Sequence, residues 1–220
     1  MVKLIFLGAP GSGKGTYSER LSPKLGVPHI STGDIFRAEV KNGTELGLKI
    51  KSLIDAGEFV PDEITIEVIK NRLSQPDCEN GFILDGFPRT LDQAKALDNI
   101  TEIDKVILLD LPEELIIKKL TGRRVCKKCG KIYNIADIRH GDLHLAPMAP
   151  EKEGVCDACG GEIIQRDDDT EEVIKERIKT YHELTEPIID YYKAKGLLMK
   201  VEVDAFADVM AEKIYNMIRE

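Results

Sequence analysis

The chain has 220 residues, of which 42% are hydrophobic and 32% are charged, as in globular proteins rather than disordered or fibrous ones. It carries 31 basic and 39 acidic residues, and the resulting net charge of −8 disfavours broad capture of nucleic acid or acidic lipid. No apolar run approaches the roughly 20 residues of a membrane span, and the first run, residues 2–7, is too short for a signal peptide. We therefore expect a soluble, cytoplasmic protein in which any anion site is local.

Five short apolar segments predict β-strands. They cover residues 2–7, 27–30, 82–85, 105–111 and 197–203. Most of them are nearly continuous in apolar residues, which is typical of strands that are covered on both faces of a parallel sheet. Because helical patterns separate the segments, we expect an α/β fold with a parallel five-stranded sheet flanked by helices.

The periodicity of apolar residues predicts several helices. The clearest cover residues 62–73, 113–120, 171–195 and 206–218. The third of these is the longest, with Thr170 as its expected N-cap. Pro187 lies inside it and is expected to kink it, because proline cannot donate the backbone hydrogen bond.

Two segments do not fit the alternation of strands and helices. Residues 31–60 are helical in pattern but lie between strand candidates, and residues 123–169 contain four paired cysteines and little helical periodicity. We interpret both as inserts on a core that comprises residues 1–30, 61–122 and 170–220.

A glycine-rich loop follows the first predicted strand. Residues 8–16 read GAPGSGKGT and precede a helical pattern, which is the context of a phosphate-binding loop. The glycines allow successive backbone N–H groups to point at phosphate oxygens, and Lys14 adds a full positive charge. One departure is that Gly15 follows the lysine, so the hydroxyl comes one residue later, at Thr16.

A carboxylate follows another buried strand. Residues 82–84 are apolar, and Asp85 follows them at the C-terminal end of the predicted strand, where ligands bind in parallel sheets. An aspartate in this place can hold Mg²⁺ through the water shell of the ion, because Mg²⁺ dehydrates reluctantly.

Four cysteines form two C-x-x-C-G knuckles separated by 26 residues; they are Cys126, Cys129, Cys156 and Cys159. Two such knuckles complete a closed tetrahedral site, so we expect a structural metal, with zinc favoured over iron for a site without a redox task. His140 and His144 lie between the knuckles and could ligate, although we expect them to face solvent. Cys78 is expected to be a small buried side chain.

The cysteine segment also leaves an alternative function open. A zinc ribbon with basic neighbours is typical of nucleic-acid-binding modules. The basic neighbours are Arg123, Arg124, Lys127, Lys128 and Lys131. The phosphate-binding loop and the net negative charge favour an enzyme instead, since a simple ribbon requires neither.

Several motifs together resemble the nucleoside monophosphate kinases, and within them the long, zinc-containing bacterial adenylate kinases. The motifs are residues 8–16, 31–34, 84–90, 122–124 and 166–169, followed by Arg177, and the resemblance covers nearly the whole chain. It implies a P-loop NTPase-like fold, with residues 31–60 as an NMP-binding helical insert and residues 123–169 as a zinc-ribbon-like LID. It further implies Mg²⁺-dependent, reversible phosphoryl transfer in which ATP and AMP give two ADP, in a monomer. A kinase for UMP, CMP or GMP is the alternative.

The resemblance also implies roles for single residues. Catalytic roles fall on Lys14, Asp85, Arg89, Arg123, Arg166 and Arg177. The ATP side comprises Gly11, Ser12, Gly13, Lys14, Gly15, Thr16, Arg123, Ile132 and Tyr133. The AMP side comprises Thr32, Arg37, Glu58, Phe59, Val60, Gly86, Phe87, Pro88, Arg89, Gln93, Arg166 and Arg177.

Two details of the resemblance keep alternatives, and one residue departs from the family pattern. Gln93 could contact an adenine edge with a paired donor and acceptor, although helix capping or surface polarity is the alternative for Gln93 and Thr32. Asp168 and Asp169 match a pair that engages the nucleotide or stabilises a closed form, or else they favour the start of the next helix. Lys119 stands where relatives often place an arginine over the ATP adenine, which predicts looser discrimination of the donor.

Overall fold

The computed structural model describes residues 2–141 and 143–219 of the chain. Its central sheet contains β1 (Val2–Leu7), β2 (His29–Ser31), β3 (Gly81–Asp85), β4 (Lys105–Asp110) and β10 (Leu198–Glu202). The helices are α1 (Lys14–Leu25), α2 (Thr32–Asn42), α3 (Glu45–Ala56), α4 (Asp62–Leu73), α5 (Leu91–Asp98), α6 (Glu113–Thr121), α7 (Glu171–Thr180), α8 (Pro187–Ala194) and α9 (Ala207–Arg219), with the 3-10 turn η1 (Pro76–Cys78) and the π-helical turn η2 (Tyr181–Thr185). Shorter strands lie between α6 and α7; they are β5 (Arg123–Cys126), β6 (Ile132–Asn134), β7 (Ile138–His140), β8 (Leu143–Leu145) and β9 (Ile163–Ile164).

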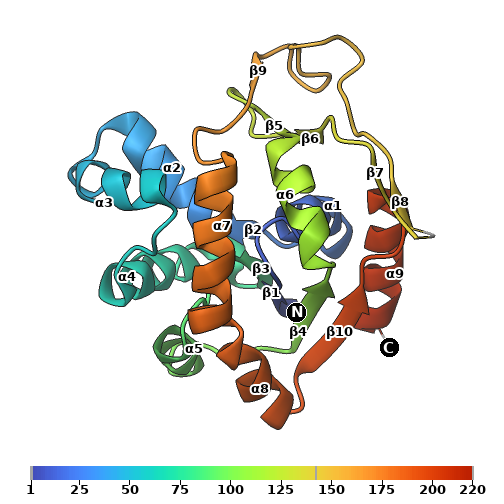
Figure 1. Ribbon diagram of the computed structural model, residues 1–220. Coiled ribbons are helices and arrows are strands. Elements are labelled where there is room, and N and C mark those ends of the chain that lie inside the picture. The colour runs from blue at the N-terminus through green and yellow to red at the C-terminus, as the bar shows by residue number, and fades with distance from the viewer. Residues whose placement is uncertain (1, 142, 220) are drawn as a thin grey trace.

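The central sheet is parallel throughout, with strand order β10-β4-β1-β3-β2. This confirms the predicted α/β architecture, and Figure 1 shows helices around the sheet. The strand β1 lies in the middle, next to β3 on one side and β4 on the other. Parallel strands end at the same edge of a sheet, so the glycine-rich loop after β1 and Asp85 at the end of β3 lie at that edge.

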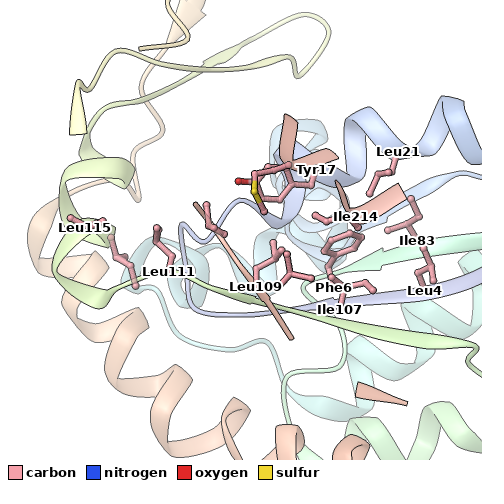
Figure 2. Close-up of a cluster of buried hydrophobic side chains, with 14 of the residues drawn as sticks. Leu4, Phe6, Tyr17, Leu21, Ile83, Ile107, Leu109, Leu111, Leu115 and Ile214 are labelled. Atoms are coloured by element: carbon pink, nitrogen blue, oxygen red, sulfur yellow. The ribbon is translucent and has the colours of Figure 1, made fainter. Parts of the chain in front are cut away.

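The alternation of side chains along β1 explains the two hydrophobic layers. Leu4 and Phe6 belong to a cluster with α1, α6, α7 and α9, part of which Figure 2 shows, and Ile5 and Leu7 belong to a cluster with α4, α5 and α8. Because both faces of the strand are covered, every one of these positions is apolar. Cys78 lies in the second cluster with 4% of its surface exposed, which confirms the prediction of a buried thiol.

Residues 31–60 form a pair of helices beside the sheet. Ser31 ends β2 and caps α2, since its hydroxyl accepts a hydrogen bond from Asp34 N at 3.3 Å. The helices α2 and α3 enclose a small core of their own around Phe36, Ile50 and Val60. In Figure 1 this pair stands apart from the sheet, at the side of α7.

Residues 123–169 form short antiparallel strands instead of helices. A three-stranded sheet has the order β6-β5-β9, and β7 pairs with β8. Figure 1 shows the first sheet above α6 and the β7–β8 pair beside α9. Ile138 of β7 is 2% exposed and belongs to the core cluster of α1 and α9, so the β7–β8 pair packs against the central domain.

The prediction of one helix over residues 171–195 was wrong, because the structure divides this segment into separate helices. The chain forms α7, widens into the π-helical turn η2 and continues as α8, in which Pro187 is the first residue. Glu186 N donates to Tyr181 O at 2.9 Å, five residues back. Pro187 has no N–H and cannot continue the hydrogen-bond pattern of α7, and the wider turn lies directly before it. The α-helix is therefore interrupted before the proline and not at the proline. Within the described residues, every helix is too short or too polar to cross a membrane.

Candidate active site

The loop after β1 wraps around the start of α1. Gly13 precedes the helix with a φ of 109°, and a Cβ there would lie 2.7 Å from the ring of Tyr17, so only glycine fits without rearrangement. Strand, loop and helix therefore have the arrangement of a P-loop, as the sequence predicts. The cleft beside it is lined by Gly11, Gly13, Lys14, Gly15 and Thr16, whereas Ser12 of the same loop is fully buried.

Lys14 is the first residue of α1 and is held by the loop itself. Its ammonium donates to Gly8 O at 2.7 Å and to Ala9 O at 2.9 Å. Burial, together with the positive charges of nearby arginines, lowers the pKa of Lys14 to about 8, although Asp85 opposes this shift. Because burial destabilises the charged form of Lys14, an anion that binds beside it stabilises that form strongly. This position is therefore suited to phosphate.

Asp85 ends β3 and lies close to the loop. Its carboxylate is 3.4 Å from His29 Nε2, and a Cβ on Gly15 would lie 3.3 Å from Asp85 Oδ2. Burial opposes the charge, but the hydrogen bond from His29 and the charge of Lys14 outweigh burial and lower the pKa of Asp85. Burial by itself would lower the pKa of His29, but the hydrogen bond to Asp85 and the charge of Asp85 outweigh it, so the pKa of His29 is raised. The carboxylate is therefore ionised at the edge of the sheet.

Arginines from distant parts of the chain meet in the same cleft. They are Arg37 of α2, Arg89 before α5, Arg123 of β5, Arg166 before α7 and Arg177 of α7. Burial and neighbouring positive charges lower the pKa of Arg166 to about 9, and burial also lowers the pKa of Arg177 to about 10. Since cations are otherwise costly to gather away from water, the cluster favours a multiply charged anion.

Two carboxylates neutralise part of this cluster. Arg123 forms a paired contact with Asp169, with Nε donating to Oδ2 at 2.8 Å and Nη2 donating to Oδ1. Arg177 Nη1 donates to Asp168 Oδ2 at 3.0 Å. Asp168 and Asp169 are 8% and 1% exposed, so they act as buried counter-charges to these arginines and not only as acidic residues at the start of α7.

The cleft continues into a smaller cavity towards α2 and α3. Its walls comprise Thr32, Gly33, Phe36, Arg37, Ile54, Gly57, Glu58, Phe59, Val60, Thr65, Gly86, Arg89, Gln93, Asp168 and Arg177. Arg89 lies where the two spaces meet, with its guanidinium carbon 5.1 Å from the centre of the Phe59 ring. Arg89 Nε and Thr32 Oγ1 both donate to Gly86 O, at 2.7 Å each. Thr32 thus fixes the turn before Arg89.

Residues of β6 and of the end of α6 line another part of the cleft. Its lining includes Lys119, Leu120, Ile132, Asn134 and Met148. Burial lowers the pKa of Lys119 to about 8. The Asn134 side chain donates to Lys119 O at 2.7 Å, which joins the end of α6 to the segment that contains β6.

Two further residues that were expected at the cleft also have their side chains elsewhere. Tyr133 was expected on the ATP side, but its hydroxyl donates to Cys156 Sγ at 3.4 Å and accepts from Asp157 N at 2.9 Å. It alternates with Ile132 along β6, so only one of the two can face the cleft. Phe87 was expected on the AMP side, but it is 0% exposed and belongs to the core cluster of α4 and α5.

The four predicted cysteines converge. Their Sγ atoms all lie within 4.8 Å of one another, with 3.5 Å between Cys126 and Cys159 and 3.6 Å between Cys129 and Cys156. A tetrahedral Zn²⁺ with Zn–S bonds of about 2.3 Å separates its sulfurs by about 3.8 Å, so the spacing fits zinc. A Cβ on Gly161 would lie 3.0 Å from Cys126 Sγ, which shows how closely the backbone cradles the thiols.

The two histidines between the knuckles make other contacts. His140 Nδ1 lies 3.0 Å from Glu114 Oε1, and His144 Nε2 lies 2.6 Å from Asp137 Oδ1. Neither belongs to the group of converging cysteines, so their interpretation as possible ligands is wrong. The expected exposure to solvent is confirmed for His140, whereas His144 is half-buried.

Several residues of the site were not predicted from the sequence. His29 contacts Asp85, and Tyr181 and Thr185 of η2 line the cleft. The signal for His29 was available, because residues 27–30 predict a strand that ends at the same edge as Asp85. Tyr181 and Thr185 carried no such signal, since their exposure to the cleft depends on the π-helical turn.

Comparison with known proteins agrees with this geometry. A model of the family described as adenylate kinase matches residues 6–197. A protein named adenylate kinase from Caldicellulosiruptor bescii is 55% identical over 203 residues, which are 90% of each chain. A protein of the same name from Caldicellulosiruptor saccharolyticus is 51% identical over 96% of each chain. Another, from Archaeoglobus fulgidus, is 52% identical over 91% of this chain and 90% of its own. The cleft at the edge of the sheet, the converging cysteines and these relatives lead to one conclusion, that the chain belongs to the adenylate kinase family of phosphotransferases.

Proposed function

We propose that the protein transfers the γ-phosphoryl group of ATP reversibly to AMP and so produces two molecules of ADP. One observation carries this proposal: two adjoining cavities meet at Arg89 and Arg177, which line both of them. Two nucleotides in these spaces would therefore have their phosphates end to end among the arginines. In the transfer, an oxygen of the AMP phosphate bonds to the γ-phosphorus, and the bond from that phosphorus to the oxygen bridging to the β-phosphorus breaks.

The protein contributes positioning and charge rather than covalent chemistry. The loop of residues 8–16 would bind the ATP phosphates through its backbone N–H groups, with Lys14 at their side. Arg123, Arg166 and Arg177 would contact the migrating group, because planar guanidinium groups can hold two oxygens at once. Arg37 and Arg89 would hold the phosphate of AMP.

We propose that Asp85 holds Mg²⁺ through water, next to the ATP phosphates. The residue fits the ion, because its carboxylate is ionised and lies near Gly15 in the loop. When bound, Mg²⁺ would neutralise charge on the phosphates. His29 keeps Asp85 charged and oriented.

The two inserts would exclude water, which competes with AMP for the phosphoryl group. In this account, residues 31–60 cover the acceptor, residues 123–169 cover the donor, and the remaining residues 1–30, 61–122 and 170–220 form the core. Contacts between the inserts support it, because Arg166 Nη2 donates to Asp34 Oδ1 at 3.3 Å and Lys41 Nζ donates to Lys127 O at 3.4 Å.

The four cysteines would bind a structural Zn²⁺. Four protein ligands leave no open position for a substrate, so the metal would organise an insert that is too small to build a large core. The alternative of a nucleic-acid-binding ribbon is not favoured, because the family match spans the cysteine segment together with the rest of the kinase chain. We further propose that the protein acts as a monomer.

A coupled assay of ADP formation tests the proposal. Purified zinc-loaded protein receives ATP, Mg²⁺ and one of AMP, GMP, CMP or UMP. We expect AMP to give the highest rate by a wide margin. A higher rate with GMP, or with UMP or CMP, would instead assign the protein to a kinase for that monophosphate.

A further inference from the structure

The side-chain amide of Gln93 has a fixed orientation. The residue is 1% exposed and lies in the first turn of α5. Its Oε1 accepts from Arg89 N at 2.8 Å, and its Nε2 donates to Asp62 Oδ1 at 2.7 Å. A backbone N–H can only donate and a carboxylate can only accept, so the two ends of the amide cannot be exchanged.

Asp62 is itself held in place. It lies in the first turn of α4, and its Oδ2 accepts from Thr90 Oγ1 at 2.6 Å. Thr90 caps α5, since its hydroxyl accepts from Gln93 N at 3.2 Å. Asp62, Thr90 and Gln93 therefore form a closed set of hydrogen bonds that joins the starts of two helices.

Gln93 lines the smaller cavity, where we place the acceptor base. After the two contacts described above, its amide retains one N–H donor and one acceptor lone pair. An amide can pair with a 6-amino purine through N6–H and N1, and after a flip it can pair equally with a 6-oxo purine through O6 and N1–H. A base site that uses a freely turning amide therefore cannot distinguish the two classes, whereas a fixed amide can.

We propose that Asp62 determines the specificity for the acceptor base: by fixing the amide of Gln93, it favours 6-amino purine monophosphates over 6-oxo purine monophosphates. Asp62 is a positioning residue that acts through Gln93. The inference rests on the proposed function, because the assignment of the cavity to AMP selects the 6-amino class.

The substitution Asp62→Asn tests the inference. Asparagine can turn its own amide to accept from Gln93 or to donate to it, so the contact at position 62 permits both orientations and only Arg89 N still favours the original one. The readout is the ratio of kcat/KM for AMP to that for IMP, a 6-oxo purine that lacks the 2-amino group of GMP. We expect this ratio to fall about tenfold, because the flip of the Gln93 amide is then opposed only by the hydrogen bond from Arg89 N and no longer by one to a charged partner. Glu63→Gln is the matched control, since it removes the other acidic side chain of the same helical turn, and it should leave the ratio unchanged.

A second variant keeps the inference testable if Asp62→Asn does not fold. Asp62→Ser keeps a side chain that suits a helix start but is too short to reach Gln93 Nε2, and it should lower the ratio as well. If either variant is folded and keeps the wild-type ratio, the inference is overturned. A wild-type protein that uses AMP and IMP equally also overturns it, whereas a protein inactive with AMP would refute the proposed function itself.

A measurement on the wild-type protein needs no variant. In NMR spectra of ¹⁵N-labelled protein, the side-chain N–H of Gln93 that faces Asp62 should exchange with solvent much more slowly than exposed side-chain amides do. Exchange at the rate of exposed amides would show that the orientation is not fixed, and would contradict the inference.

Discussion

Removing the charge of Asp169 should destabilise the protein strongly. The carboxylate is fully buried, and its partner Arg123 is 15% exposed. In Asp169→Asn, one of the two acceptor oxygens becomes an N–H donor that faces a guanidinium donor, and the positive charge of Arg123 loses its counter-charge. Breaking a buried ion pair in this way costs about 3–5 kcal/mol.

We expect the lower end of this range, because Arg123 keeps some contact with water. For a chain of this length, 1 kcal/mol corresponds to roughly 2–4 °C, so a loss of about 3 kcal/mol lowers the Tm by roughly 6–12 °C. Thermal unfolding of the zinc-loaded protein measures the shift, and urea titration at 25 °C should show a lower midpoint with an unchanged slope.

The control for this experiment is an ion pair on the surface. Glu171 Oε1 lies 2.7 Å from Lys175 Nζ, and both side chains are more than half exposed. Glu171→Gln should therefore leave the Tm unchanged within error. If Asp169→Asn lowers the Tm no more than this control does, the buried pair does not stabilise the fold as we argue.

Three further predictions concern Lys14, the metal and Lys119. In the proposed mechanism a charged Lys14 binds phosphate. Because burial lowers the pKa of Lys14 to about 8, kcat/KM should fall as the pH rises through about 8, and a profile that stays flat to pH 10 would disprove this role. Removal of the metal with a chelator, followed by calorimetry and activity assays, should lower the Tm while substantial activity remains at moderate temperature, and a folded but inactive apoprotein would contradict a structural role. Lys119→Arg should raise the preference for ATP over GTP as donor, since a guanidinium plane covers a base better than an ammonium does; an unchanged ratio of kcat/KM values would remove Lys119 from the donor site.

Much of the fold could be predicted because its signals are local. The strands of the sheet are apolar runs that are covered on both faces, and each lies within two residues of its expected bounds. The cysteine cluster was equally accessible, since each C-x-x-C-G knuckle has a fixed local geometry. The contact of Asp85 with the loop after β1 follows from two adjacent parallel strands that end at one edge.

The features that escaped prediction depend on contacts between distant segments. Thr185 Oγ1 donates to Arg89 O at 2.9 Å, across 96 residues of sequence, and the π-helical turn that positions Thr185 has no signature except the nearby Pro187. The side chain of Tyr133 could not be assigned to the metal side of β6 from sequence, because its neighbour Ile132 is also apolar and the period of two allows either orientation. Similarly, the pairing of Arg123 with Asp169 joins β5 to the start of α7, and nothing local specifies it.

The most direct test of the account follows the phosphoryl group itself. Protein loaded with zinc is incubated with Mg²⁺, unlabelled AMP and ATP labelled at the γ-phosphate, and the products are separated. We predict that the label appears in the β-position of ADP with no transient release as inorganic phosphate, and that Lys14→Ala, shown to be folded, transfers it about a hundredfold more slowly or worse. Absence of labelled ADP with the folded, zinc-loaded wild-type protein, or label found mainly in inorganic phosphate, would contradict direct transfer between two nucleotides in one shielded cleft.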